Sequence, residues 1–320
     1  MNDDRQEEYD DEFRSNRLSK RFGKLTALDH VNVHLEKGKI YGLLGRNGAG
    51  KSTLLNILNG RNRQTEGSFT IDGENPGNDQ ALRKIYMVGP DNLFPAKKLK
   101  DILKITATFY PGFALNEALA DLDRFDLSPD RRFDKLSTGN SSLFKSVVAL
   151  RSGAEYLFLD EPTLGHDAVN REMFYENVLS VFAETQSCIV LSSHLISELA
   201  PLLQEVIFIQ KGKILIQEES DALMEKYRLL SGSIEQVQNL VQAHPEMTVV
   251  QKQEVGAMAQ WVVESDAWEA LSTASLGISV QKLDLQRLFI ALTKEHPDAA
   301  AKNTSQKRSF LGRINQDEKR

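Results

Sequence analysis

The sequence has a single cysteine, Cys188, among its 320 residues, so no disulfide can form within the chain. A lone cysteine in an apolar segment is typical of a reducing compartment, and we expect Cys188 to pack as a small core side chain. No apolar run approaches the roughly 18 residues that a membrane helix needs. The first residues, MNDDRQEEYDDEF, also lack the basic and then apolar order of a secretory signal. The sequence therefore predicts a chain that neither spans a membrane nor carries such a signal.

An excess of basic residues is also missing. The chain has 39 Lys and Arg against 45 Asp and Glu, a formal net charge of −6, which argues against broad nucleic-acid binding. We therefore expect no nucleic-acid partner. With 41% hydrophobic and 26% charged residues, the composition is that of a globular protein, and the length suffices for one large and one smaller domain.

Charge is unevenly distributed at the two ends of the chain. Residues 1–15 are crowded with Asp and Glu, which repel one another, so we expect an acidic, solvated leader, with an interaction tail as the alternative. Residues 301–320 carry more basic than acidic side chains and no apolar period. This pattern predicts a flexible basic tail, with contact to anionic lipid headgroups as the alternative.

Short apolar runs alternate with segments of helical period between these ends. The runs at 40–44, 156–159 and 188–191 have the length and composition of buried strands. The segment 206–217 is predicted to form a hairpin around Lys211 and Gly212. Parallel strands interleaved with helices indicate an α/β core that binds ligands at the carboxyl ends of its strands.

The composition shifts near Ser220, which predicts a second, smaller domain over 221–300. Its pattern mixes helices and strands, and Trp261 and Trp268 are expected in its core. The predicted helices are 234–243, 267–273 and 285–293, and the predicted strands are 248–251, 260–263 and 278–283.

The strand at 40–44 runs into a glycine-rich segment that fits the pattern G-x-x-x-x-G-K-[ST]. Glycines let successive N–H groups point inward at phosphate oxygens, and the helix that follows adds the positive end of its dipole. Lys51 is expected to reach the β- and γ-phosphates, and the hydroxyl of Ser52 to ligate Mg²⁺. The alternative is a glycine-rich turn without a ligand. The loop comprises Gly45, Arg46, Asn47, Gly48, Ala49, Gly50, Lys51 and Ser52, and Thr53 follows it.

Two carboxylates, Asp160 and Glu161, end the predicted strand at 156–159. The first is well placed to hold Mg²⁺, and the second to polarise an attacking water as a general base. A lone Asp-Glu pair at a strand end is usually a solvated turn, but the phosphate-binding loop in the same chain favours the catalytic interpretation.

Three further segments accompany that pair in a fixed order. The segment Leu136-Ser137-Thr138-Gly139-Asn140 precedes Asp160, Asp167 follows it, and His194 comes after the next predicted strand. With the glycine-rich loop, they resemble the motifs of the ATP-binding cassette (ABC) ATPase subunits, whose usual signature is L-S-G-G-Q. Five motifs in the expected order are far more specific than any one of them.

The resemblance implies an α/β P-loop NTPase fold of the ABC-ATPase type over residues 16–220, with a helical signature subdomain at about 90–150 and a small C-terminal α+β domain. It implies binding and hydrolysis of ATP with Mg²⁺, and ATP-driven pairing with a second ABC ATPase subunit, identical or different. It also implies a polytopic membrane permease as partner, on the cytoplasmic face of the cell membrane. The segment 283–289 resembles the close of exporter-type subunits for drugs, antibiotics, peptides or lipids.

The resemblance also assigns roles to individual residues. Phe22 corresponds to an aromatic that stacks on adenine, and His194 to a histidine that contacts the γ-phosphate. Lys51, Glu161 and His194 are the implied catalytic residues, and Ser52 and Asp160 the implied Mg²⁺ ligands. The nucleotide-binding set consists of Phe22, the loop residues 45–53, and Ser137, Gly139 and Asp167, of which the signature residues serve the nucleotide of the second subunit.

The chain departs from the family pattern at several positions. Thr138 and Asn140 replace the usual Gly and Gln of the signature, and His166 replaces a more common leucine. The glutamine that the family places near Pro90 is missing, with Asp91 or Asn92 as the candidate replacement. These departures leave open a soluble regulatory module that turns over slowly, and a translation-associated ABC protein is a further alternative.

An aromatic cluster lies in the predicted helical subdomain. Phe109, Tyr110 and Phe113 surround Pro111-Gly112. The cluster is either a docking surface for the membrane partner or part of the local core.

Overall fold

A computed structural model of the chain describes residues 12–77, 79–91, 94–268 and 277–294. The chain divides into two compact units, the first ending at Ser220 and the second beginning at Asp221. Most of the predicted leader, Asn92, much of the predicted helix at 267–273 and the predicted basic tail lie outside the described residues. Within the described ranges, no helix is long and apolar enough to cross a membrane.

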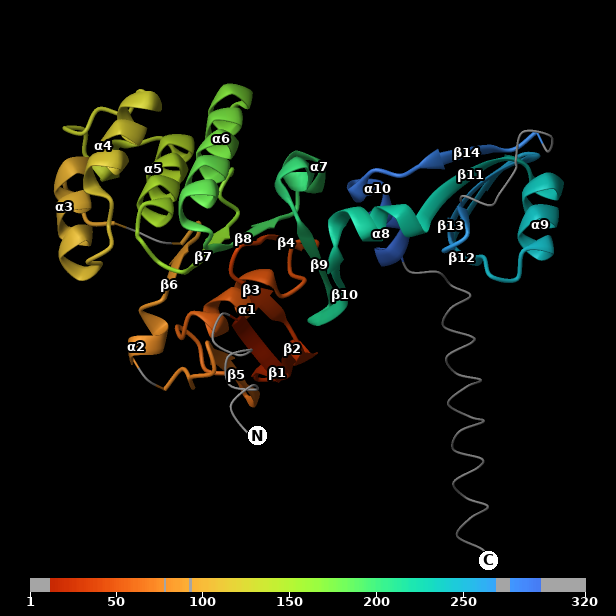
Figure 1. The fold of residues 1–320 in the computed structure, drawn as a ribbon, viewed down its shortest axis with the longest axis horizontal. Coiled ribbons are helices and arrows are strands. Elements are labelled where there is room, and N and C mark those ends of the chain that lie inside the picture. Colours follow the sequence, from red (N-terminus) through yellow and green to blue (C-terminus); the bar gives the residue numbers. More distant parts are fainter. Residues whose placement is uncertain (1–11, 78, 92–93, 269–276, 295–320) are drawn as a thin grey trace, which may run out of the picture. The chain divides into compact units, whose positions relative to one another are not determined.

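A six-stranded sheet forms the centre of the first unit, in the order β10-β9-β4-β8-β7-β6 (Figure 1). All neighbours are parallel except β9 and β10, which form the predicted hairpin. Each residue of β4, β6, β7 and β8 is buried, which explains why these strands have continuous apolar sequences. The strands are β4 (Ile40–Leu44), β6 (Ile85–Val88), β7 (Tyr156–Asp160), β8 (Cys188–Ser193), β9 (Glu205–Gln210) and β10 (Lys213–Glu219). Burial raises the pKa of the Cys188 thiol, as fits a core side chain.

A second, antiparallel sheet precedes the phosphate-binding loop and comprises β1 (Glu12–Phe22), β2 (Leu25–Val31), β3 (His34–Glu36) and β5 (Glu66–Ile71). The leader was expected to extend through residue 15, but residues 12–15 belong to β1. The reason is Phe13, which is fully buried and stacks on Phe69 with ring centroids 5.3 Å apart. This burial outweighs the local cost of the acidic residues beside it.

Helices α3, α4 and α5 pack together in the region expected to be the helical subdomain, and Figure 1 shows them as neighbours. The spacing of Val147, Val148, Leu150 and Arg151 predicts an amphipathic helix behind the signature, but each residue of α5 from Leu143 to Leu150 is buried. The cause is burial between other elements of the unit, since α5 contacts α3, α4, α6, β6 and β7. The helices and 3₁₀ turns of the first unit are α1 (Lys51–Leu58), α2 (Asp79–Leu82), α3 (Leu99–Phe109), α4 (Leu115–Arg124), η2 (Phe133–Lys135), α5 (Thr138–Leu150), α6 (Ala168–Thr185), α7 (Ile196–Leu199) and η3 (Ala200–Leu202).

The aromatic cluster of this region divides between core and surface. Phe113 is 8% exposed, whereas Phe109 is 73% exposed. Tyr110 packs on Tyr86 with ring centroids 4.9 Å apart. Phe109 is therefore the member that remains accessible to a partner.

The second unit has a four-stranded antiparallel sheet in the order β12-β13-β11-β14. Helix α9 starts with a capping box in which Ser233 and Gln236 satisfy each other's backbone N–H groups. Trp261 is buried in the core beside α9, and Trp268 packs against that core as expected. The elements after the boundary are α8 (Ser220–Lys226), β11 (Tyr227–Ser233), α9 (Ile234–Ala243), β12 (Thr248–Val255), β13 (Met258–Glu264), β14 (Ser279–Lys282) and α10 (Leu285–Thr293).

Candidate functional site

The glycine-rich loop joins the carboxyl end of β4 to the N-terminus of α1, as the sequence predicts. Gly48 and Gly50 have φ of 79° and 114°, in a region that L-residues with side chains rarely adopt. Gly50 also leaves no room for a side chain, because an added Cβ would lie 2.9 Å from the carbonyl oxygen of Ala27. The loop can therefore turn its backbone N–H groups towards an anion at the start of α1.

Lys51 places a buried ammonium inside this loop. The residue is only 6% exposed, and its Nζ donates to the carbonyl oxygen of Gly45 at 2.8 Å. The same Nζ lies 3.5 Å from Oε1 of Glu161. A charge so poorly hydrated and with one weak ionic partner favours the entry of an anion into the loop.

Asp160 ends β7 and is almost completely buried. Its Oδ1 accepts a hydrogen bond from the hydroxyl of Ser192 on β8, the neighbouring strand. Gly89 packs directly against it, since a Cβ added there would lie 3.2 Å from the Cβ of Asp160. The carboxylate is thus held between two elements of the sheet edge.

Glu161 follows in an unusual backbone conformation, with φ of 49°. Its N–H donates to the carbonyl oxygen of Ser192 at 3.0 Å. Its side chain lies between Lys51 and His194, because Oε2 is 2.9 Å from Nδ1 of His194. The structure brings the three implied catalytic residues together, and a residue in this conformation at a sheet edge is typical of a functional site.

A cavity of about 540 Å³ surrounds the loop. Phe22, half exposed at the end of β1, lies on its wall with loop residues 47–53 and Glu161. The ammonium of Lys20 sits 4.9 Å from the centroid of the Phe22 ring. The volume is within the range of small-molecule sites, and an aromatic wall opposite a phosphate loop suits a nucleotide with a flat base.

Sequence reasoning missed part of this wall. Leu25, Thr26 and Ala27 of β2 line the cavity, and so do Lys211 and Gly212 of the β9–β10 turn. Only the turn had a sequence signal, and that signal predicted a hairpin. These residues reach the site through sheet pairing and packing across the chain.

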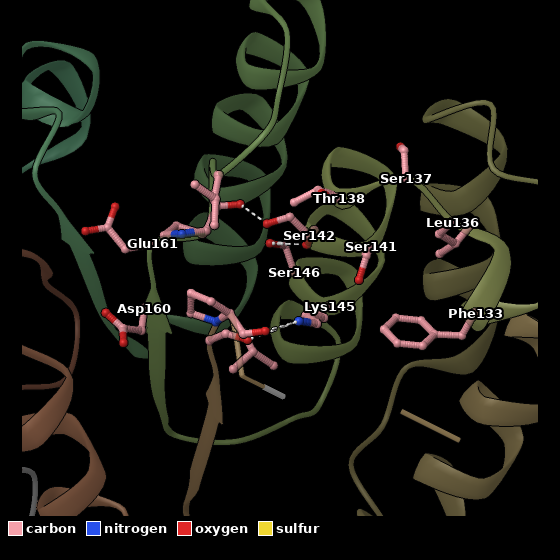
Figure 2. A pocket seen from close by; sticks show the side chains of 15 residues that line it. Phe133, Leu136, Ser137, Thr138, Ser141, Ser142, Lys145, Ser146, Asp160 and Glu161 are labelled. Atoms are coloured by element: carbon pink, nitrogen blue, oxygen red, sulfur yellow. Dashed lines mark hydrogen bonds between the residues drawn. The ribbon is translucent and has the colours of Figure 1, made fainter. Parts of the chain in front are cut away.

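The signature segment lies outside this cavity and lines a second one of about 250 Å³. Figure 2 shows Ser137 and Thr138 across from Asp160 and Glu161, with α5 between the walls. Ser137 caps α5, because its Oγ accepts from the N–H of Asn140 at 3.2 Å. Gly139 is needed for close approach, since an added Cβ would lie 2.3 Å from the carbonyl oxygen of Gly165.

Asp167 and His166 occupy the loop between β7 and α6. Asp167 caps α6 through a 2.8 Å bond from the N–H of Asn170 to its Oδ1. His166 is 7% exposed, and neither ring nitrogen has a partner among the described residues. Burial, helped by the positive charge of Arg171, lowers the pKa of His166 to about 4, so the imidazole is neutral at pH 7.

The residues present fit a magnesium ion held jointly with phosphates. Mg²⁺ in such sites takes one or two protein carboxylates or hydroxyls and keeps its other ligands from phosphate and water. Asp160 and the exposed Ser52 at the start of α1 are of this kind. Among the described residues, no group of three or more His, Cys, Asp or Glu side chains could hold a metal alone. This donor set suits an ion that arrives with a nucleotide.

Comparison with known proteins gives a consistent result. The family described as "ABC transporter" matches residues 28–164. The lantibiotic transport ATP-binding protein SrtF of Streptococcus pyogenes is 32% identical over 220 residues, which are 68% of this chain and 95% of SrtF. The bacitracin transport ATP-binding protein BcrA of Bacillus licheniformis is 31% identical over 217 residues, 66% of this chain and 71% of BcrA.

Solved structures show the same fold. A dimeric bacterial ABC transporter cassette superposes with a TM-score of 0.58 at 21% identity, over 65% of this chain and 98% of that one. The ATP-binding subunit of an ABC transporter superposes with a TM-score of 0.59 at 22% identity, over 66% and 91% of the two chains. The α/β P-loop fold expected from the sequence is thereby confirmed.

Proposed function

This chain belongs to the ABC transporter family as an ATP-binding subunit and ATPase, and from this premise we propose that it powers the export of antibiotic-like compounds. Two relatives are named for transport of a lantibiotic and of bacitracin, which supports this cargo class. The proposed partners are a polytopic permease and a second ABC ATPase subunit, with the chain on the cytoplasmic face of the membrane.

Within one subunit, the proposed chemistry depends on three side chains. Lys51 binds the β- and γ-phosphates from inside the loop, since its ammonium is already buried there. Glu161 orients the attacking water, and His194 holds the Glu161 carboxylate in place through its Nδ1 at 2.9 Å. Mg²⁺, when bound by Ser52 and Asp160 with the nucleotide, supplies charge neutralisation at the phosphates.

One observation carries the proposal of a paired cassette. The signature residues Ser137 and Gly139 do not line the cavity that holds Lys51 and Phe22. Ser137 instead caps a helix, where backbone N–H groups favour an anion. A nucleotide in the loop cavity would therefore meet a signature segment only from a second subunit. Asp167, at the neighbouring helix N-terminus, is proposed to join that contact.

The variant Glu161→Gln tests this pairing. It removes the general base and keeps the side-chain volume, so Mg·ATP should bind without turnover and hold the dimer together. Size-exclusion chromatography with light scattering should report a dimer with Mg·ATP and a monomer without nucleotide. The exposed Glu172→Gln on α6 serves as the matched control and should not trap a dimer. A Glu161→Gln protein that stays monomeric in saturating Mg·ATP would contradict the proposal.

Affinity isolation from detergent-solubilised native membranes tests the partner. A polytopic membrane protein recovered in stoichiometric amount is the expected result, and its identity would narrow the cargo class. Recovery of the chain without any membrane protein would favour a nucleotide-dependent regulatory module instead.

A further inference from the structure

Lys145 is a buried cation that the proposed chemistry does not use. It lies in the middle of α5 and is 8% exposed. Its Nζ donates to the carbonyl oxygens of Pro90 at 2.9 Å and Gly89 at 3.2 Å, the contact drawn beside the Lys145 label in Figure 2. Among the described residues it forms no ion pair, and burial lowers its pKa. A buried ammonium is costly to desolvate, so its two carbonyl partners are strongly held.

The Gly89–Pro90 loop, which accepts both hydrogen bonds from Lys145, packs against Asp160, the proposed magnesium ligand. A Cβ added to Gly89 would lie 3.2 Å from the Cβ of Asp160 and 3.7 Å from its Oδ2. Gly89 therefore leaves no spare room beside Asp160, so a shift of this loop towards the carboxylate would press on it.

Helix α5 also forms a hydrogen bond to the chain that follows Glu161. The hydroxyl of Ser142, three residues before Lys145, donates to the carbonyl oxygen of Pro162 at 2.6 Å. One side of α5 thus bonds to both loops that flank the carboxylate pair (Figure 2). Lys145 lies only six residues from Gly139, about 9 Å along a rigid helix from the signature end.

We propose that Lys145 is a positioning residue that fixes the Gly89–Pro90 loop against Asp160 and links the metal-binding end of β7 to the signature end of α5. The inference rests on the proposed function, since it assumes the composite site of a dimer. When the second subunit's nucleotide moves the N-terminus of α5, Lys145 carries that movement to the Asp160 of its own subunit. One nucleotide site thereby senses the occupancy of the other.

The variants Lys145→Met and Lys145→Arg test whether the hydrogen bonds of Lys145 to the Gly89–Pro90 loop position Asp160. Methionine keeps the buried stem and loses both hydrogen bonds, whereas arginine retains donors for the two carbonyls. Mn²⁺ would replace Mg²⁺ as the probe, titrated by electron paramagnetic resonance with a non-hydrolysable ATP analogue bound. Loss of a supporting contact around a metal ligand typically weakens metal affinity about 10-fold or more. We expect that loss for methionine, at least partial recovery for arginine, and metal-free nucleotide affinity within about twofold of wild type.

Two further variants keep the test decisive. Gly89→Ala crowds Asp160 from the loop side and leaves the Lys145 side chain itself unchanged, and it should weaken Mn²⁺ binding in the same way even if Lys145→Met does not fold. Lys135→Met, a change at an exposed lysine close to the signature, is the matched control and should titrate as wild type. Unchanged Mn²⁺ affinity in Gly89→Ala and in folded Lys145→Met would overturn the inference. A wild-type chain that binds no nucleotide would refute the proposed function instead.

Discussion

Replacing His166 by leucine removes a buried imidazole whose two ring nitrogens have no hydrogen-bond partner among the described residues. The ring lies 5.9 Å from that of Phe174, and Arg171 donates to the backbone carbonyl of His166 at 3.4 Å. Arg171 disfavours the imidazolium form, and Asp167 favours it more weakly. A leucine would fill the same apolar contact without a titratable group.

The sign of the pH effect follows from the two pKa values. The imidazole titrates at 6.5 in the unfolded chain and at about 4 in the fold, so the unfolded chain binds the proton more readily. The contribution of neutral His166 to the free energy of unfolding is fully present above pH 6.5 and is lost as the pH falls towards 4. At about 1.4 kcal/mol per pH unit, the whole window corresponds to about 3 kcal/mol.

Thermal unfolding of wild type and His166→Leu between pH 7.5 and pH 4 measures this pH-dependent loss of stability. For a unit of this size, about 3 kcal/mol is equivalent to about 6–12 °C in Tm. The Tm of wild type should fall by that much more than the Tm of the variant, because all other titrations cancel in the comparison. The partly exposed His244→Gln is the control and should follow wild type. Parallel Tm curves for wild type and His166→Leu would refute the assignment of a neutral, buried His166.

Three other changes have expected outcomes. Lys51→Ala should abolish ATP binding in calorimetry, because it removes the ammonium buried in the phosphate loop, and unchanged affinity would rule out that role. Phe22→Ala should weaken ATP more than inorganic triphosphate if the ring stacks on adenine, and equal losses would refute the stacking. Arg151→Met should cost about 3–5 kcal/mol in chemical denaturation, because it leaves the Asp121 carboxylate buried without its bidentate partner at 2.7 and 3.2 Å. A loss below about 1 kcal/mol would mean that solvent reaches that pair.

Strands β4, β7 and β8 of the central sheet could be predicted because each is buried on both faces. The runs at 40–44 and 188–191 are continuous in apolar residues, so a local pattern is sufficient. Strand β1 has no such pattern, since it carries five charged residues in its eleven and is interrupted by irregular pairing near Arg17. Its place depends on partners far along the chain, above all β5. A sequence pattern within one segment cannot reveal pairing strands that lie far along the chain.

The residues of the candidate site likewise divide into those that could be predicted from the sequence and those that could not. The loop at 45–52 and the Asp160–Glu161 pair could be found because each is a contiguous motif at a predicted strand end. Lys145 could not, since a lysine on a predicted helix gives no sign that its ammonium is buried on the carbonyls of Gly89 and Pro90. The contact exists because α5 is buried on every face from Leu143 to Leu150, which the sequence pattern of an amphipathic helix did not indicate.

The backbone conformation of Glu161 depends on tertiary structure and could not be predicted from the local sequence. A glutamate with φ of 49° is disfavoured on its own by roughly 1–3 kcal/mol, and no residue nearby in sequence marks it. Pairing across the sheet makes it possible, because the Glu161 N–H continues the ladder to Ser192 at 3.0 Å. The turn then directs the carboxylate towards Lys51 at the start of α1, beyond the end of β4, and towards His194, just after the end of β8. The order β4-β8-β7 places these ends side by side, so the strain at one residue is maintained by three strands and assembles the three side chains proposed to act on ATP.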